Sequence, residues 1–363
     1  MKYWRGYLTA AILFLCTWAL REFARAHSVL VDMIYPYVTR MMQAFLSNWS
    51  SGVDYCLWQA LILVLAAVGI GSLVLLVILK WNPVRWFGWV CAGVAAVMLL
   101  NTALFGLNEF SGSLAEDVYL NETDYTIAEL ESAAVYFRDQ ANTLSARVER
   151  DHKGDVVFAD FDTLAVQAAD GYNALVYDYS LPVFAGPLGP VKKLGWADHY
   201  TAQGVTGVMV GLTGEAAVNP QTPAVMLPFA ICREMARRMS ILAERDASFG
   251  AYMACLANED PQFRYSGALM GYRYCLVALE ELDKVTGDNA AQRVAEGATL
   301  DVRRDLLACS GFLNRGEQKD VDTCDLLTSW HIQEIVLPTL LEEEELFDPM
   351  DKTQVDLSDH PYA

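Results

Sequence analysis

Charged side chains at helical spacing distinguish one segment of the sequence. Arg233, Glu234 and Arg237 follow Pro228 in a stretch with helical periodicity, and Asp246 comes shortly afterwards. On an α-helix, side chains three or four residues apart are neighbours, so Glu234 is within reach of Arg237. By themselves, these residue types support charge-assisted hydrogen bonds between guanidinium and carboxylate groups.

The residue types that usually bind metals are dispersed along the chain. The five histidines have no metal-ligand spacing, and the eight cysteines include no C-x-x-C pair, so a thiolate zinc site is not expected. The dipeptide Asp198-His199 is the alternative source of ligands, provided that it approaches the charged segment. Cys309 and Cys324 could close a modest disulfide loop in an oxidising compartment, and the sequence leaves this open.

Several short segments around the charged helix occur in a characteristic order. They are Thr213-Gly214-Glu215-Ala216-Ala217, Pro228-Phe229, Arg233-Glu234-Met235-Ala236-Arg237, Asp246-Ala247-Ser248-Phe249 and Tyr265-Ser266-Gly267. This order resembles a family of bacterial membrane proteins of unknown function, with three N-terminal spans and an outer zincin-like metallopeptidase domain. The family typically has Thr-Gly-Glu-Ala-Asn, Pro-Phe, His-Glu-Met-Ala-His, Glu-Ala-Asn-Phe and Tyr-Ser-Gly. The match extends over about 205–280.

The resemblance implies the scaffold of a zinc peptidase but not its chemistry. In a zincin, two histidines one helical turn apart and a downstream acid bind zinc, and a glutamate activates the metal-bound water. Here Arg233 and Arg237 occupy the histidine positions, and a guanidinium has no lone pair to donate. Asp246 occupies the third-ligand position, and Glu234 keeps the general-base position as a vestige. We therefore expect no metal and no cofactor here; zinc is expected only in relatives that keep the histidines.

Three arrangements of the substituted residues remain open. In the first, an Arg233–Asp246–Arg237 cluster replaces zinc and holds two helices together, with Glu234 absorbed into it. In the second, the arginines form a solvated helix face, and in the third they line an anion-binding pocket. By the same resemblance, Gly214 and Glu215 belong to a strand edge that receives peptide by strand addition; a structural turn is the alternative.

Three apolar stretches precede this region and predict membrane spans. Residues 57–79 and 86–107 are each long enough to cross about 30 Å of hydrocarbon. The first stretch, about 6–21, is interpreted as a short retained span, with a cleaved signal as the alternative. Residues 21–55 are interpreted as a connection. The short loop between Lys80 and Arg85 carries two positive charges and no acid, which favours the cytoplasmic side and places the rest of the chain outside.

Composition separates the chain at the same boundary. The 363 residues are 54% hydrophobic with a net charge of −19, and the mean hydropathy is +0.21. Residues 1–106 carry seven Lys/Arg and three Asp/Glu, whereas the remaining residues carry 19 and 42. Nucleic-acid binding requires a basic surface, so the acidic part excludes it. The expected partners are the lipid bilayer and, at the outer face, a peptide or protein ligand.

The predicted fold is mostly α. It comprises a membrane region over 1–107, an α+β zincin-like extracytoplasmic domain over 108–330 and an acidic tail over 331–363. A capping box at Thr126 and Glu129 begins a long helix, and residues 204–219 are predicted to be extended.

The predicted function is that of a multi-pass protein of the bacterial plasma membrane without hydrolytic activity. Its outer domain is expected to bind or scaffold a partner at the cell envelope. Two alternatives stay open. One is an active membrane-bound metallopeptidase with a non-standard metal site, and the other is a structural or regulatory partner of an active relative.

Overall fold

The computed structural model describes residues 4–315 and 322–339. Four long helices form its first part: α1 (Arg5–Ala26), α2 (Ser28–Ser50), α3 (Leu57–Ile78) and α4 (Pro83–Leu104). Among the described residues, α1, α3 and α4 are long and apolar enough to cross a membrane, which confirms three candidate spans. The first extends to Ala26, beyond the predicted 6–21, and in its last turns Arg21 and Arg25 form ion pairs with Glu109 and Glu22.

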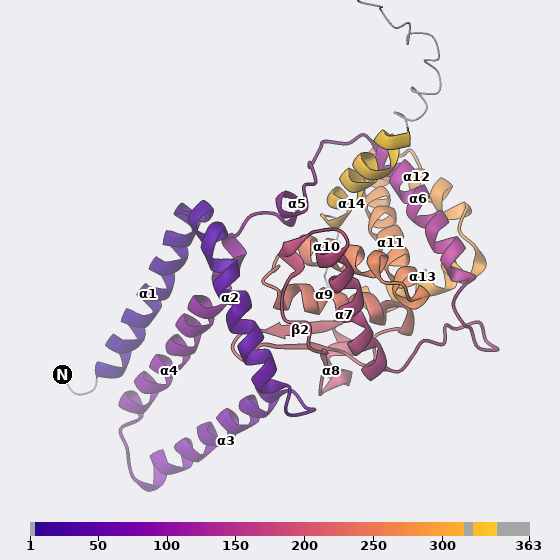
Figure 1. Ribbon diagram of the computed structural model, residues 1–363. Helices are drawn as coiled ribbons and strands as arrows, with labels where there is room; N and C mark the ends of the chain where they lie inside the picture. The colour runs from indigo at the N-terminus through magenta and orange to yellow at the C-terminus, as the bar shows by residue number, and fades with distance from the viewer. Residues whose placement is uncertain (1–3, 316–321, 340–363) are drawn as a thin grey trace, which may run out of the picture.

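Helices α1 and α4 pack in parallel. A side-chain carbon added to Gly6, near the start of α1, would lie 2.5 Å from the backbone carbon of Gly88, near the start of α4. At the other end, Ala24 packs with Leu107, which follows α4. Close glycine contact between membrane helices lets their backbones approach and pack tightly. In Figure 1 the two helices run side by side, and α3 stands apart from them.

The predicted connection between the first two spans contains a helix, α2, that was not assigned from the sequence. The residues of α2 that are buried against the rest of the chain are Val31, Pro36, Thr39, Gln43, Ser47 and Ser50. Most of them are polar, so the stretch lacks the uniform hydropathy by which a span is recognised in the sequence. Its helical periodicity is nevertheless regular.

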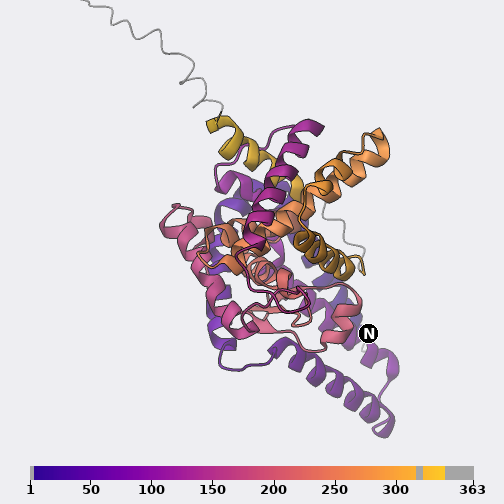
Figure 2. The ribbon, with the colours of Figure 1, turned by 90° about the vertical axis from the view of Figure 1, so that its right-hand side faces the viewer.

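A mostly helical domain follows these four helices (Figures 1 and 2). Its helices are η1 (Gly106–Phe110), α5 (Leu114–Asp117), α6 (Ile127–Ser145), α7 (Phe161–Tyr177), η2 (Pro182–Phe184), α8 (Ala197–Ala202), η3 (Ala224–Met226), α9 (Leu227–Arg238), α10 (Glu244–Ala257), α11 (Pro261–Thr286), α12 (Ala290–Glu296), α13 (Leu300–Leu313), α14 (Thr323–His331) and η4 (Ile332–Val336). The predicted capping box is confirmed, because Thr126 and Glu129 exchange side-chain and backbone hydrogen bonds at the start of α6.

A small sheet lies beside α9. Its strands are β1 (Lys192–Lys193), β2 (Gly207–Val210) and β3 (Glu215–Val218), in the order β1-β3-β2. β3 is parallel to β1 and antiparallel to β2, with Gly207 opposite Val218 and Val210 opposite Glu215. The predicted extended region thus contains a two-stranded hairpin, whose inner strand β3 is completely buried.

The end of the described chain differs from the predicted boundary at residue 331. The π-helical turn η4 directly continues α14, and Trp330 of α14 contacts the rings of Phe137 and Tyr252 in the core. The packing of this partly buried tryptophan against the core keeps the segment attached to the domain. The acidic part of the predicted tail, from residue 340 onwards, lies outside the described residues. Cys309 and Cys324 are both buried free thiols, so no disulfide joins them.

Candidate functional site

Two consecutive helices, α9 and α10, bring the charged residues together. α9 is buried along almost its whole length, with Pro228 in its first turn. It ends in a turn in which Ser240 takes a left-handed conformation (φ 76°) and the Ile241 N–H donates to the carbonyl of Ala236. This closure reverses the chain, so that the first turn of α10 returns to the last turn of α9.

The charged residues Arg233, Glu234, Arg237 and Glu244, together with the hydroxyl of Thr206, form a set of contacts that we call the α9–α10 ion network. Oε1 of Glu234 lies 3.0 Å from Nη1 of Arg237 and 3.6 Å from Nε of Arg233. Nη1 of Arg233 donates to Oε1 of Glu244 at 2.9 Å. Arg237 also pairs with Glu244, and Arg233 donates to the hydroxyl of Thr206. Two cations therefore alternate with two carboxylates across the two helices.

Glu234, the predicted vestigial general base, is the most deeply buried residue of the network. The Glu234 side chain is completely buried, and the Arg233 side chain is 7% exposed. A carbon added to Gly207 of β2 would lie 2.5 Å from Cγ of Glu234, so the sheet lies directly over this side chain. Burial lowers the pKa of Arg237, and the charge of Glu234 opposes this shift. The arginines thus do not form a solvated face, and carboxylates rather than an external anion neutralise them.

The predicted Arg233–Asp246–Arg237 cluster is wrong in its acidic member. Oδ1 of Asp246 lies 3.3 Å from Nε of Arg245, and Oδ2 accepts a hydrogen bond of 3.2 Å from the Leu114 N–H. Residues two apart on a helix point in nearly opposite directions, so Glu244 faces α9 while Asp246 faces away. Glu244, Thr206 and their roles were missed in the sequence, although an acid in the first turn after a helix reversal is a usable signal.

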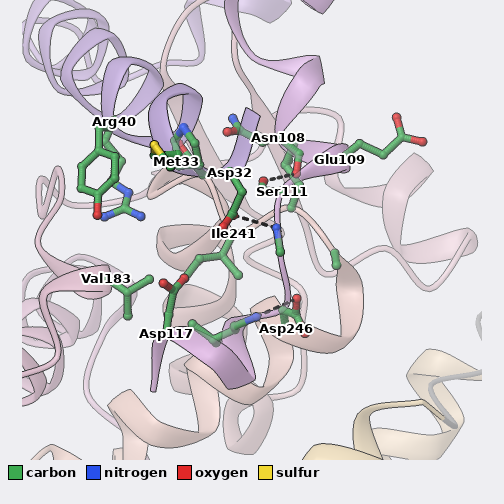
Figure 3. A pocket seen from close by; sticks show the side chains of 17 residues that line it. Asp32, Met33, Arg40, Asn108, Glu109, Ser111, Asp117, Val183, Ile241 and Asp246 are labelled. Atoms are coloured by element: carbon green, nitrogen blue, oxygen red, sulfur yellow. Dashed lines mark hydrogen bonds between the residues drawn. The ribbon is translucent and has the colours of Figure 1, made fainter. Parts of the chain in front are cut away.

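Asp246 instead lines a pocket of about 210 Å³ between α2 and the domain (Figure 3). Asp32 of α2 and Asp117 of α5 line the same pocket, together with Arg40. Oδ1 of Asp32 accepts a 2.7 Å hydrogen bond from the Gly112 N–H. Burial raises the pKa of Asp246, while the Leu114 N–H and Arg245 oppose that shift. Burial and the charge of Asp32 also raise the pKa of Asp117.

The residues of the predicted metal position do not fit zinc. Zinc requires lone pairs from imidazole, thiolate or carboxylate groups, and two of the three expected positions carry guanidinium groups. In the described residues, 4–315 and 322–339, no group of three or more His, Cys, Asp or Glu side chains is placed to hold a metal ion. Asp198 and His199 lie on α8, where they contact the side chains of Gln221 and Gln203.

Gly214 and Glu215 were predicted to lie at an edge open to peptide, and the structure shows a different arrangement. β3 is the central strand of the sheet. The Glu215 carboxylate is completely buried and accepts hydrogen bonds from the backbone N–H groups of Leu57 (2.8 Å) and Trp58 (3.0 Å), and from Nζ of Lys192 (2.7 Å). It therefore caps the first turn of α3 with a negative charge, where such a charge is favourable. We call Glu215, Lys192, Leu57 and Trp58 the β3–α3 junction.

The backbone beside this junction requires a glycine at position 214. Its φ is +69°, in the left-handed region, and an added side-chain carbon would lie 2.7 Å from both Cβ of Leu46 and the backbone N of Ser47 in α2. The residue is thus a close contact between the domain and α2. Gly214 and Glu215 join the domain to the membrane helices, as in the structural-turn alternative.

These features define a protein with three candidate membrane spans, a mostly helical domain that contacts α2 and α3, and a buried ion network in that domain. The chain belongs to the family described as proteins of unknown function, DUF3810, whose model matches residues 31–321. Comparison with curated proteins and with solved structures finds no match.

Proposed function

We propose that this protein is a membrane-anchored, degenerate relative of zinc metallopeptidases that has lost hydrolytic activity and binds or scaffolds a partner at the envelope of a bacterial cell. The proposed partner is a peptide or a protein at the outer face. The zincin-like nature of the domain rests on the order of sequence motifs described above. The loss of hydrolysis rests on the geometry of Glu234.

The observation that carries the proposal is the state of the Glu234 carboxylate. A general base must be within hydrogen-bonding reach of the proton that it removes, directly or through one water. Glu234 is completely buried, with β2 above it and a guanidinium group on each side. Its Oε1 atom already pairs with the guanidinium groups of Arg233 and Arg237 inside the fold. Its geometry supports an ion pair within the fold and not water activation.

The arrangement of the membrane helices supports an outer location for the domain. The loop between α3 and α4 carries Lys80 and Arg85 without an acid, as cytoplasmic loops commonly do. If α3 crosses inward before that loop and α4 crosses outward after it, the domain is extracytoplasmic. The parallel packing of α1 on α4 is consistent with this path, because it places the N-terminus of the chain on the same side as the loop.

Metal content and peptide hydrolysis of the full-length protein test the loss of activity. We expect purified protein in nanodiscs to contain no stoichiometric zinc, and to hydrolyse unstructured peptides no faster than its Glu234→Gln variant. Stoichiometric zinc together with hydrolysis that Glu234→Gln abolishes would establish the alternative of an active metallopeptidase with a non-standard site.

A reversion variant serves as the control for this assay. Arg233→His together with Arg237→His places two imidazoles beside Glu244, so we expect this double variant to acquire zinc binding. A further Glu244→Gln change should remove the gained zinc, whereas Asp246→Asn should not, because Asp246 faces away from α9.

Orientation requires a separate measurement in whole cells. A cysteine introduced at Lys80 should react only with a membrane-permeant maleimide, whereas one at Tyr119, an exposed residue of the domain, should also react with an impermeant reagent. Background labelling is removed by replacing Cys16 and Cys91, which are not buried. The reverse labelling pattern would place the domain in the cytoplasm.

A further inference from the structure

Helix α2 has a polar face that is bound to the rest of the protein. Oγ1 of Thr39 lies 2.8 Å from Oγ of Ser240, and Nε2 of Gln43 donates to the carbonyl of Gly211 at 3.0 Å. One turn further on, Nη1 of Arg238 donates to Oγ of Ser47 at 3.2 Å. These hydrogen bonds follow one side of the helix and fix it to the turn after α9 and to the loop between β2 and β3.

The opposite side of α2 is apolar and uncovered. We call it the outer face of α2; its residues are each between 47 and 76% exposed: Leu30, Met33, Ile34, Tyr37, Val38, Met41, Phe45 and Trp49. A surface helix of a water-soluble domain shows the reverse pattern, with apolar residues inward and polar residues outward. A continuous apolar stripe of this length is costly in water and indicates a contact surface.

Helix α2 lies between two candidate membrane spans in the chain. α1 ends at Ala26, immediately before α2, and α3 begins at Leu57, shortly after it. In Figure 1, α2 lies between the domain on one side and α1, α3 and α4 on the other, and it runs from the end of α1 to the beginning of α3. Both ends of α2 are therefore held at the ends of candidate spans.

The number of crossings excludes α2 as a fourth span. α1 and α4 run parallel, since Gly6 contacts Gly88 at one end and Ala24 packs with Leu107 at the other. If α3 crosses once between them, α4 returns in the direction of α1. An additional crossing by α2 would make α4 antiparallel to α1. Given three spans, α2 must stay on the side of the membrane that carries the domain.

We propose that α2 lies in the plane of the membrane interface, with its outer face in contact with lipid and its polar face carrying the domain. An in-plane amphipathic helix buries its apolar side about 5–10 Å into the boundary between headgroups and acyl chains. Tyr37 and Trp49 on this face are the amphipathic aromatic residues that favour this depth. The domain is then seated directly on the bilayer, and the pocket lined by Asp32 and Arg40 lies at headgroup level.

This inference rests on the membrane anchoring in the proposed function and not on the loss of hydrolysis. It is tested by attaching a nitroxide spin label to single cysteines, Met41→Cys and Phe45→Cys, in full-length protein in which Cys16 and Cys91 have been replaced. The protein is reconstituted in phosphatidylcholine–phosphatidylglycerol nanodiscs. Collision of each label with oxygen, which concentrates in lipid, is compared with collision with a water-soluble nickel chelate.

Two matched positions serve as controls. A label at Val285, an exposed apolar residue of the domain, should favour the nickel chelate, and a label at Leu63, an exposed residue of α3, should favour oxygen. We expect labels at 41 and 45 to behave like the one at 63. If they behave like the label at 285, α2 is not in lipid. If they are shielded from both reagents, protein covers this face and the proposal is wrong. Nickel access at 63 would instead overturn the spanning assignment itself.

Discussion

Two buried glutamates of the domain are neutralised in different ways. Glu234 belongs to the α9–α10 ion network, where its partners are close in sequence and lie in the same domain. Glu215 belongs to the β3–α3 junction, where it binds the Leu57 N–H, 158 residues away in sequence. Both are completely buried, so each negative charge depends on the cations and N–H groups around it. One carboxylate stabilises the interior of the domain, and the other joins the domain to a candidate membrane span.

This comparison separates two effects that a loss of charge can have. Removal of an acid from a buried pair leaves a cation without compensation, which costs more than the pair itself contributed. In the α9–α10 ion network, the loss lowers the free energy of unfolding of the domain. At the β3–α3 junction, the loss also weakens the attachment of α3 to the sheet. The following variants are ordered from the largest expected effect to the smallest.

Glu234→Gln should have the largest effect on stability. The amide cannot neutralise Arg233 and Arg237, although both keep their ion pairs with Glu244. We expect a destabilisation of about 3 kcal/mol, as is typical when one partner of a buried ion pair is removed. Chemical unfolding of the full chain in detergent, followed by circular dichroism, measures it. Glu131→Gln, which removes one of the two acidic partners of the well-exposed Arg293, is the control and should have no measurable effect.

An unchanged unfolding midpoint in Glu234→Gln would contradict the view that this carboxylate stabilises the fold. It would favour a site in which the two arginines do not need Glu234 to be stable inside the fold. Conversely, a lower midpoint together with unaltered Arg–Glu244 contacts would show that Glu234 contributes through its own burial and pairing.

Glu215→Gln should have a smaller effect that is concentrated at the junction. The amide oxygen still accepts one hydrogen bond, but Nζ of Lys192, whose side chain is 12% exposed, loses its anion. We expect a loss of about 2 kcal/mol and faster proteolysis between α2 and α3, because the cap of α3 is weakened. Lys193→Gln, which changes the neighbour of Lys192 on β1 and breaks an exposed ion pair with Asp162, is the matched control. Equal protease sensitivity in both variants would show that Glu215 does not attach α3.

The sequence predicts the parts of this structure that have a local signal. Residues 57–79 and 86–107 are apolar on every side, so their spans are recognisable without any partner. Thr126 and Glu129 mark a helix start by themselves. The alternation of apolar and polar residues in α2 is equally regular, but one face of the helix is polar. A search for uniformly apolar stretches therefore does not detect α2.

The partners in the two buried clusters have no comparable signal. Whether Glu244 or Asp246 faces α9 depends on the turn at Ser240, whose left-handed conformation the sequence does not reveal. The contact between Glu215 and the start of α3 depends on how the whole domain is placed against the membrane helices. Motif resemblance identified the positions of Arg233, Arg237 and Glu234 but assigned their acidic partner to the wrong side of α10.

Gly214→Ala tests the close contact between the domain and α2. A left-handed φ disfavours alanine by about 1–2 kcal/mol, and the added carbon also meets Leu46 and Ser47. Gly287→Ala is a matched control, because Gly287 has a similar φ of +72° with open space around it. We expect Gly214→Ala to lower the unfolding free energy by about 1 kcal/mol more than Gly287→Ala does. Equal losses would mean that α2 moves away without cost.

Asp246→Asn should have the smallest effect, and its sign should depend on pH. Burial raises the pKa of Asp246 above its ordinary value of 3.8, so the folded protein holds the proton more tightly than the unfolded chain. The contribution of the aspartate to stability is therefore greatest below pH 3.8 and decreases as the pH rises through the folded-state pKa. Asparagine does not titrate, and its side-chain oxygen can still accept from the Leu114 N–H.

The unfolding free energies of the wild-type protein and Asp246→Asn should thus converge as the pH rises above 3.8, and at neutral pH the variant should be equal or slightly more stable, by less than about 1 kcal/mol. The measurement is chemical unfolding at several pH values, with the exposed Asp139→Asn as a control for the loss of one negative charge. A variant that becomes progressively less stable than the wild type as the pH rises would show that the ion pair with Arg245 outweighs burial. Asp246 would then resemble Glu234 in depending on a guanidinium group.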